Sequence, residues 1–377
     1  MRSREWQGSA DTLSDGRIVV RNPAVGVWDS TNAWRLESDL RIGTASGTGA
    51  NLFASIRAIE VDAYGRIYIL EGQSAEVRVF TSDGAHLRTF GRRGEGPGEF
   101  RFPTGMTWAP DGRLWVADPG NARYAVFDTT GAYVAFHRSS VAGIMLPWLG
   151  GIDTVGRLYD QTWINGEDAL VRSRGPISEP NDALPLDTFP LPNYRRKEIL
   201  LLDARGTLQA SMPVPFTPMM LRHIDPRAYV WFGVSDQYRI VQARFTGDTI
   251  RIIERAYDPL PVHQEEVDSA LKFTETLLRA GGRLEGAASP SIKPAYEWFT
   301  VDDRGFLWVY ASVSMDERGR VLDVFDDAGR FLGGAHANFR FDPRFRPLIR
   351  GADCYMVLRD ELDVPYVIRA RIVGRQD

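Results

Sequence analysis

The sequence has few of the residues that build disulfides, zinc sites and membrane spans. Its single cysteine, Cys354, excludes an intrachain disulfide framework and any zinc site made of cysteines. The longest apolar-rich stretch, Gly143 to Ile152, is interrupted by Pro147 and is far shorter than the roughly 20 residues of a spanning helix. No apolar segment follows the basic first residues, so the sequence as written has no secretory signal. We expect a cytoplasmic protein as written, or a periplasmic or extracellular one if a signal peptide has been removed.

The sequence also lacks a strong excess of charge of one sign. It has 45 Lys and Arg against 49 Asp and Glu, a formal net charge of −4, which does not fit a dedicated nucleic-acid binder. Arginine nevertheless outnumbers lysine, so single-stranded RNA binding through a local basic face stays open as a weaker alternative. Hydrophobic residues at 44% and charged residues at 25% are ordinary for a globular chain, which at this length can bury a sizeable core.

Recognisable catalytic motifs are missing. There is no Gly-x-Ser-x-Gly turn for a nucleophilic serine. The glycine-rich run 91–98 lacks the Gly-Lys-Ser/Thr ending of a phosphate-binding loop, so we interpret it as a connector between repeats. The five histidines do not pair at metal-ligand spacing; they are His86, His137, His223, His263 and His336. We expect no catalytic residues and no cofactor or metal, with a divalent ion in a central channel as the alternative.

An internal repeat is the strongest positive signal. Residues 63–84 align with 110–131 without a gap at an offset of 47, which places Gly65 on Gly112. In both copies, short alternating segments rich in β-branched and aromatic residues are separated by Asp-Gly or X-Gly turns. This pattern is typical of the strands of an all-β repeat.

Similar turns and strands recur down the chain and predict six units of four strands. The third unit is expected to close at Leu201 to Gly206, and the last, 351–373, lacks an outer strand. N-terminal strands at 16–20 and 34–42 have no inner strands of their own, so we expect them to complete the last unit and close a ring. Closure removes the exposed sheet edges of an open row of strands.

The segment that joins the first two units has the most specific pattern: Phe90-Gly91-Arg92-Arg93-Gly94-Glu95-Gly96-Pro97-Gly98-Glu99-Phe100, continued by Asp111-Gly112-Arg113-Leu114-Trp115-Val116-Ala117-Asp118. It resembles the NHL-repeat signature over roughly residues 54–138. The resemblance implies an all-β, six-bladed β-propeller of the bacterial type, closed by N-terminal strands and forming a single domain over residues 1–377. NHL proteins include protein- and RNA-binding modules, and the wider six-bladed class includes lactonases and lyases, so the resemblance indicates fold better than function.

Four segments depart from the repeat: the N-terminal extension 1–15, the proline-rich insertions 173–198 and 212–226, and the helical insertion 264–280. In the helical insertion, Val267, Leu271, Leu278 and other apolar residues fall on one helix face. Gly281 is its expected C-terminal cap. We expect this one short helix to pack over a face of the propeller, with a partner-binding lid as the alternative.

These features favour a soluble, non-catalytic scaffold that binds protein partners. We expect an accessory subunit or interaction module of a larger complex, either soluble or membrane-associated. Loops on a rigid scaffold commonly carry function. The partner-binding candidates therefore come from the proline-rich insertions: Tyr194, Arg195, Arg196, Lys197, Arg222 and His223. The alternative is a metal-dependent enzyme of the lactonase or lyase type. It requires carboxylates or imidazoles in the central funnel within about 2.0–2.6 Å of one ion.

Overall fold

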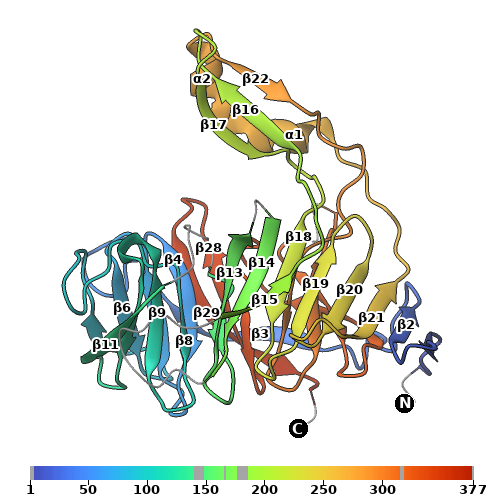
Figure 1. The fold of residues 1–377 in the computed structure, drawn as a ribbon, viewed down its shortest axis with the longest axis horizontal. Helices are drawn as coiled ribbons and strands as arrows, with labels where there is room; N and C mark the ends of the chain where they lie inside the picture. Colours follow the sequence, from blue (N-terminus) through green and yellow to red (C-terminus); the bar gives the residue numbers. More distant parts are fainter. Residues whose placement is uncertain (1–3, 140–147, 165–166, 176–185, 315–317, 376–377) are drawn as a thin grey trace.

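The computed structural model describes residues 4–139, 148–164, 167–175, 186–314 and 318–375. Six four-stranded antiparallel sheets form the blades of a β-propeller, and a smaller substructure rises from one face of it (Figure 1). The predicted all-β, six-bladed fold is confirmed.

In each blade the strands run from the central channel to the rim in chain order, except that an N-terminal strand completes the last. Blades one to three consist of β4 (Ile56–Val61), β5 (Ile67–Glu71), β6 (Glu76–Phe80) and β7 (His86–Phe90); β8 (Gly105–Trp108), β9 (Leu114–Asp118), β10 (Arg123–Phe127) and β11 (Tyr133–Arg138); and β12 (Gly151–Ile152), β13 (Leu158–Ile164), β14 (Glu167–Ser173) and β15 (Leu186–Pro190). Blades four to six consist of β18 (Met220–Ile224), β19 (Val230–Val234), β20 (Arg239–Ala243) and β21 (Thr249–Arg255); β23 (Tyr296–Val301), β24 (Leu307–Ala311), β25 (Val321–Phe325) and β26 (Phe331–Ala337); and β27 (Leu348–Arg350), β28 (Asp353–Arg359), β29 (Pro365–Val373) and β3 (Arg35–Ile42).

Ring closure follows the prediction for one N-terminal strand and differs for the other. β3 pairs antiparallel with β29 and completes blade six. The earlier strand, β2 (Ile18–Asn22), instead lies parallel to β21 on the rim of blade four, where β1 (Ser9–Thr12) extends it. The buried side chain of Asn22 holds β2 there: its amide donates to the carbonyls of Glu254 and Gly329, and its oxygen accepts from Phe331 N–H.

A repeated hydrogen-bond motif ties the turns to the blade cores. An aspartate before the second strand of a blade accepts backbone N–H groups of its own turn, and an aromatic side chain six residues later donates to it. Blades one, three, four and five have the pairs Asp62 with Tyr68, Asp153 with Tyr159, Asp225 with Trp231, and Asp302 with Trp308. In blade six the same kind of pair, Asp360 with Tyr366, lies one turn later, before the third strand β29. Blade two has Ala109 at this position, and the indole N–H of Trp115 finds no partner among the described residues.

The limits expected for the proline-rich insertions were wrong. β15, inside the predicted insertion 173–198, pairs with β14 and buries Phe189, so it is the strand that closes blade three. Residues 176–185 of that segment lie outside the described part of the chain. β18, inside the predicted insertion 212–226, is the inner strand of blade four. Proline misled the prediction because it is tolerated at strand ends and on sheet edges.

The segments that leave the ring are residues 191–219 and 256–295, and together they form the substructure above it (Figure 1). We call its outer part the arm (residues 198–213 and 263–286) and the connecting segments the stalk. The arm contains β16 (Glu198–Leu202), β17 (Leu208–Pro213), α1 (Gln264–Leu271), the 3-10 turn η2 (Lys272–Thr274), α2 (Glu275–Arg279) and β22 (Arg283–Gly286). The hairpin at Leu201 to Gly206 therefore belongs to the arm and not to blade three.

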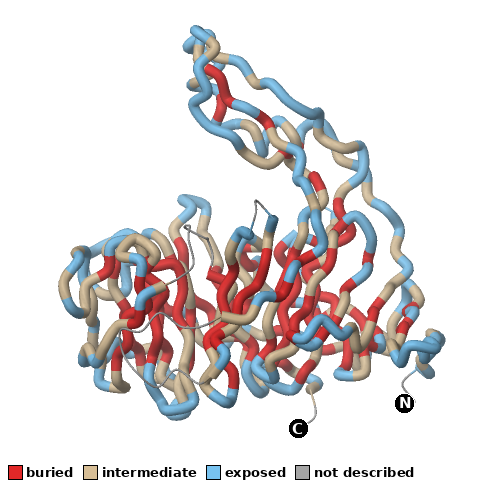
Figure 2. Tube along the Cα trace, viewed as in Figure 1, coloured by how far each residue is buried: buried red, intermediate tan, exposed pale blue. Residues whose placement is uncertain are grey.

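The predicted helix is divided by η2, and Gly281 terminates it with a positive φ of 82°. Leu271 and Leu277 pack on Ile199 and Leu201 of the arm sheet. The expected packing of the helix on the propeller was wrong, because its apolar face is covered by strands inserted elsewhere in the sequence. Buried positions are dense through the blades and sparse in the arm (Figure 2).

Candidate functional site

The inner strands of all six blades line a central channel with two overlapping cavities. One, of about 520 Å³, lies at the ends of these strands. The other, of about 430 Å³, lies at their beginnings, on the face from which the arm rises. His223 and Glu60 line both cavities, so the two cavities are stacked along the channel.

An ion pair crosses the channel wall between blades one and six. The carboxylate of Glu60, on β4, accepts from the guanidinium of Arg350, on β27, at 3.0 Å. Burial raises the pKa of Glu60, and the charge of Arg350 opposes this shift. Because the pair joins the first and last blades of the ring, it reinforces closure.

A second group of polar residues lies on blades four and six. Arg346, just before β27, donates from Nη1 to the backbone carbonyl of Arg222 at 3.0 Å. Burial, and then the neighbouring charge of Arg222, lower the pKa of Arg346 to about 10. Burial, and then the charge of Arg346, lower the pKa of His223 to about 3, so this imidazole is neutral at physiological pH. Its Nε2 has no hydrogen-bond partner in the described part of the chain.

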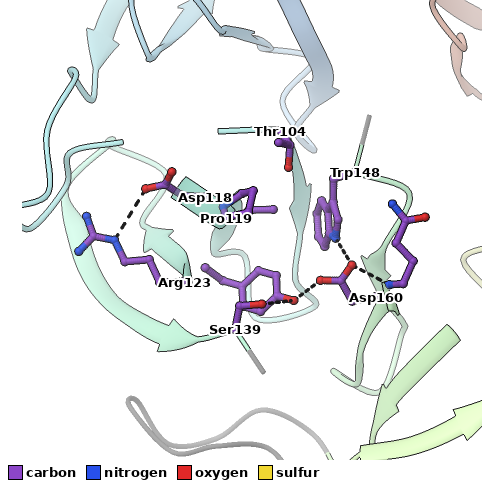
Figure 3. A pocket seen from close by; sticks show the side chains of 10 residues that line it. Thr104, Asp118, Pro119, Arg123, Ser139, Trp148 and Asp160 are labelled. Atoms are coloured by element: carbon purple, nitrogen blue, oxygen red, sulfur yellow. Dashed lines mark hydrogen bonds and ion pairs between the residues drawn. The ribbon is translucent and has the colours of Figure 1, made fainter. Parts of the chain in front are cut away.

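A separate polar cluster lies between blades two and three around a cavity of about 20 Å³, room for about one water molecule (Figure 3). The carboxylate of Asp160 accepts from the hydroxyl of Tyr124, from Trp148 Nε1 at 3.0 Å and from the Gln161 N–H at 2.7 Å. Burial raises the pKa of Asp160 to about 6, although these hydrogen bonds lower it. We interpret the cluster as a joint between blades, since donors from Tyr124, Trp148 and Gln161 converge on one carboxylate.

The structure divides the predicted partner-binding residues between two places. Tyr194, Arg195, Arg196 and Lys197 lie in the stalk. There the Tyr194 hydroxyl donates to Pro218 O at 2.7 Å and Arg196 pairs with Glu198.

Arg222 and His223 lie on β18 instead. Arg222 is buried and donates to Gln161 Oε1 at 2.7 and 3.0 Å, and it also pairs with Asp168. Arg222 thus braces blade four against blade three, whereas His223 faces the channel.

Sequence reasoning missed Arg346 and Arg350 as channel residues. Arg346 lies just before β27 and Arg350 is its last residue, and β27 is the shortest inner strand besides β12. The turn after β27, Gly351-Ala352, lacks the aspartate that follows the inner strands of blades one, three, four and five, so the turn pattern did not mark β27 as an inner strand.

Within the described residues, no three His, Cys, Asp or Glu side chains gather as metal ligands do. His86, His137 and His336 lie on outer strands, as expected. No helix in the described ranges is long and apolar enough to cross a bilayer.

This architecture defines a class: a ring of six four-stranded blades around a channel is a six-bladed β-propeller. A family model described as "6-bladed beta-propeller" matches residues 47–108. NHL repeat-containing protein 3 of mouse is 37% identical over 87 residues, and the human protein is 34% identical over 94. These matches confirm the NHL-like character of the repeats. They cover 22% and 23% of this chain and about a quarter of each relative, 25% and 27%.

One solved structure extends the fold similarity to 94% of the chain. A Bacteroides fragilis protein that is predicted to be exported superposes with a TM-score of 0.50 at 11% identity, over 94% of this chain and 99% of its own. Virginiamycin B lyase of Staphylococcus aureus reaches 0.45 at 12% identity, over 89% and 99% of the two chains. Identities this low support the shared fold and not a shared activity.

Proposed function

We propose that this protein is a non-catalytic scaffold in which the propeller is a rigid platform and the arm contacts a protein partner. The observation that carries the proposal is the arm itself. Two insertions far apart in the sequence combine into one substructure that projects away from the propeller (Figure 1). The projection covers none of the blade cores, so its contribution to the stability of the ring is small.

The surface of the arm has the character of a contact surface. Large apolar side chains are exposed on it: Phe273 at 62%, Leu208 at 56%, Leu278 at 44% and Leu200 at 37%. β17 is an edge strand, so its outer backbone groups are available to a further strand within the described structure. Exposed aromatic and aliphatic residues on a projecting element are typical anchors in protein interfaces.

The stalk adds a basic segment below the arm. Arg195, Arg196 and Lys197 are exposed. Charges at the edge of an apolar contact mainly steer association and select partners. The candidates at Tyr194 to Lys197 therefore fit the proposal as selectivity residues, with the arm supplying most of the affinity.

The structure offers a clean way to remove the arm. Val214 N–H donates to Lys197 O at 2.9 Å, and Val262 N–H donates to Ser291 O at 2.9 Å. Residues 198–213 and 263–290 can therefore each be replaced by a two-residue Asn-Gly turn that joins chain segments already hydrogen-bonded to each other. We expect the propeller to fold without the arm.

The test compares affinity purifications from the native host for the full chain, the armless variant and Leu362→Ser. Leu362 is 80% exposed on the propeller and serves as the matched control. We expect a partner that the full chain and the control recover and the armless variant loses. With the purified partner, Phe273→Ser should weaken binding at least tenfold, as interface anchors do. Recovery of the same partner by the armless variant, or lactone hydrolysis by a metal-loaded monomer, would contradict the proposal.

A further inference from the structure

The channel cavity beneath the arm contains positive charge without matching negative charge. Arg346 and Arg57 both lie on its wall, and both are half-buried. No ion pair is found for either one within the described ranges of the chain. Arg344 also lines this cavity, but it pairs with Asp342 at 2.9 Å. Glu60, the one carboxylate among the described lining residues, is held by Arg350.

A guanidinium inside a protein without a counterion is costly, because burial removes water and nothing replaces it. The position of Arg346 shows this cost, since burial lowers its pKa to about 10. Two other arginines inside this ring are matched by side chains: Arg255 pairs with Asp323 at 2.8 Å and Arg222 bonds to Gln161. The unmatched charge in the channel therefore indicates a ligand that supplies the anion.

The free edge of Arg346 indicates the class of anion. Nη1 already donates to Arg222 O, which fixes the guanidinium plane. The described residues supply no hydrogen-bond partner for Nε and Nη2, the edge that can form two parallel hydrogen bonds with a carboxylate. The half-buried side chains of Phe345, Leu348 and Ile224 line the same cavity and offer an apolar surface.

We propose that this end of the channel binds a small organic carboxylate, with Arg346 as its ion-pair partner and the apolar wall holding its hydrocarbon body. Arg57 supplies further positive potential. The volume of about 430 Å³ lies in the range of small-molecule sites. Arg344 lines the cavity with a side chain that is 66% exposed, so the site communicates with solvent.

His223 reports on occupancy. The charge of Arg346 helps to hold its imidazole neutral. An anion bound to Arg346 offsets that charge, so binding should raise the pKa of His223. This readout does not depend on the arm or its partner.

The experiment uses 4-fluorobenzoate as the probe and follows its fluorine NMR signal during titration with the full chain. We expect saturable binding that the neutral isostere 4-fluorobenzamide does not show. Arg346→Gln should weaken binding at least tenfold, the loss expected for a charge-assisted bidentate pair. Arg92→Gln, which changes an arginine with a side chain 78% exposed and far from the channel, should bind as the wild type does.

Two further results decide the proposal. Arg346→Gln should melt no lower than the wild type, because it removes an unmatched buried charge; a much lower Tm would make Arg346 structural and overturn the assignment. Saturating 4-fluorobenzoate should raise the pKa of His223 in proton NMR, with His223→Gln assigning the signal. Equal binding of acid and amide, or displacement of the probe by inorganic phosphate at lower concentration than by benzoate, would also overturn the carboxylate assignment.

Discussion

The propeller and the arm are built from the same kinds of strand and turn, yet they bury their residues very differently. In the ring, each blade packs against two neighbours, and Trp231, Trp308, Tyr159 and Tyr310 are almost completely buried. In the arm, three strands and two short helices share a small core around the buried Ile199 and Leu201, to which Val214 at the top of the stalk adds a third buried residue. A repeat gains stability from its neighbours, whereas an insertion must supply its own core. We therefore expect the arm to be locally less stable than the ring.

The largest expected effect comes from truncating one buried side chain in each region and comparing the losses in the free energy of unfolding of the ring. Trp308→Ala removes a fully buried indole that packs in the core of blades five and six and donates to Asp302. It should lower the free energy of unfolding of the ring by about 4 kcal/mol. Leu201→Ala, a comparable deletion in the arm, should leave the unfolding of the ring unchanged and speed amide exchange in residues 198–213 and 263–286.

Hydrogen-exchange mass spectrometry together with urea denaturation measures both effects. If Leu201→Ala lowers the midpoint of the main transition as much as Trp308→Ala does, the arm and the ring unfold as one unit. Such a result would contradict an arm whose stability is independent of the ring.

A smaller effect, of about 3 kcal/mol in the free energy of unfolding, comes from the titration of Asp160, which lies in the joint between blades two and three. Its pKa rises from 3.8 to about 6 on folding, so between these values the folded chain holds a proton that the unfolded chain has released. The contribution of this group to stability therefore falls as pH rises through that window, by about 3 kcal/mol for about two pKa units. Asp160→Asn should abolish this loss, because its Oδ1 still accepts from Trp148 and Gln161 and its amide can donate to Tyr124.

Urea titrations at pH 4, 5, 6 and 7 check this, with the wild type losing stability relative to Asp160→Asn as pH rises. Asp128→Asn is the matched control of opposite sign. Hydrogen bonds from Thr130 and the turn backbone lower the pKa of Asp128, so its contribution is present above the unfolded pKa and is lost as pH falls. Parallel stability curves for wild type and Asp160→Asn would show that Asp160 is ionised throughout.

The ring was predictable from the sequence, and the arm and the channel site were not, for physical reasons. The 47-residue offset captures turns such as Gly65 and Gly112, both with positive φ, which are local in sequence. The hairpin of β16 and β17 has the same local signals as a blade hairpin, including the turn at Asp203. Only its pairing with β22, some 80 residues later, places it in the arm. The unmatched charge of Arg346 likewise depends on ring closure, which brings β18 and the segment before β27 together.

The smallest effect comes from giving blade two the aspartate contact that blades one, three, four and five have at the same turn. Ala109 stands where those blades have aspartate, and Trp115 Nε1 beside it is buried without a partner in the described structure. Ala109 and Trp115 also border a common cavity, so there is room for a carboxylate. Ala109→Asp should therefore stabilise the ring by about 1–2 kcal/mol, by accepting the indole N–H and the N–H of Arg113.

Thermal unfolding at pH 7 measures the gain, with Ala109→Asn as the uncharged control, and amide exchange in the arm should not change. Trp115 stacks on His137 with ring centroids 4.4 Å apart. A variant that melts below the wild type would show that this stacking keeps the indole N–H from reaching the introduced aspartate.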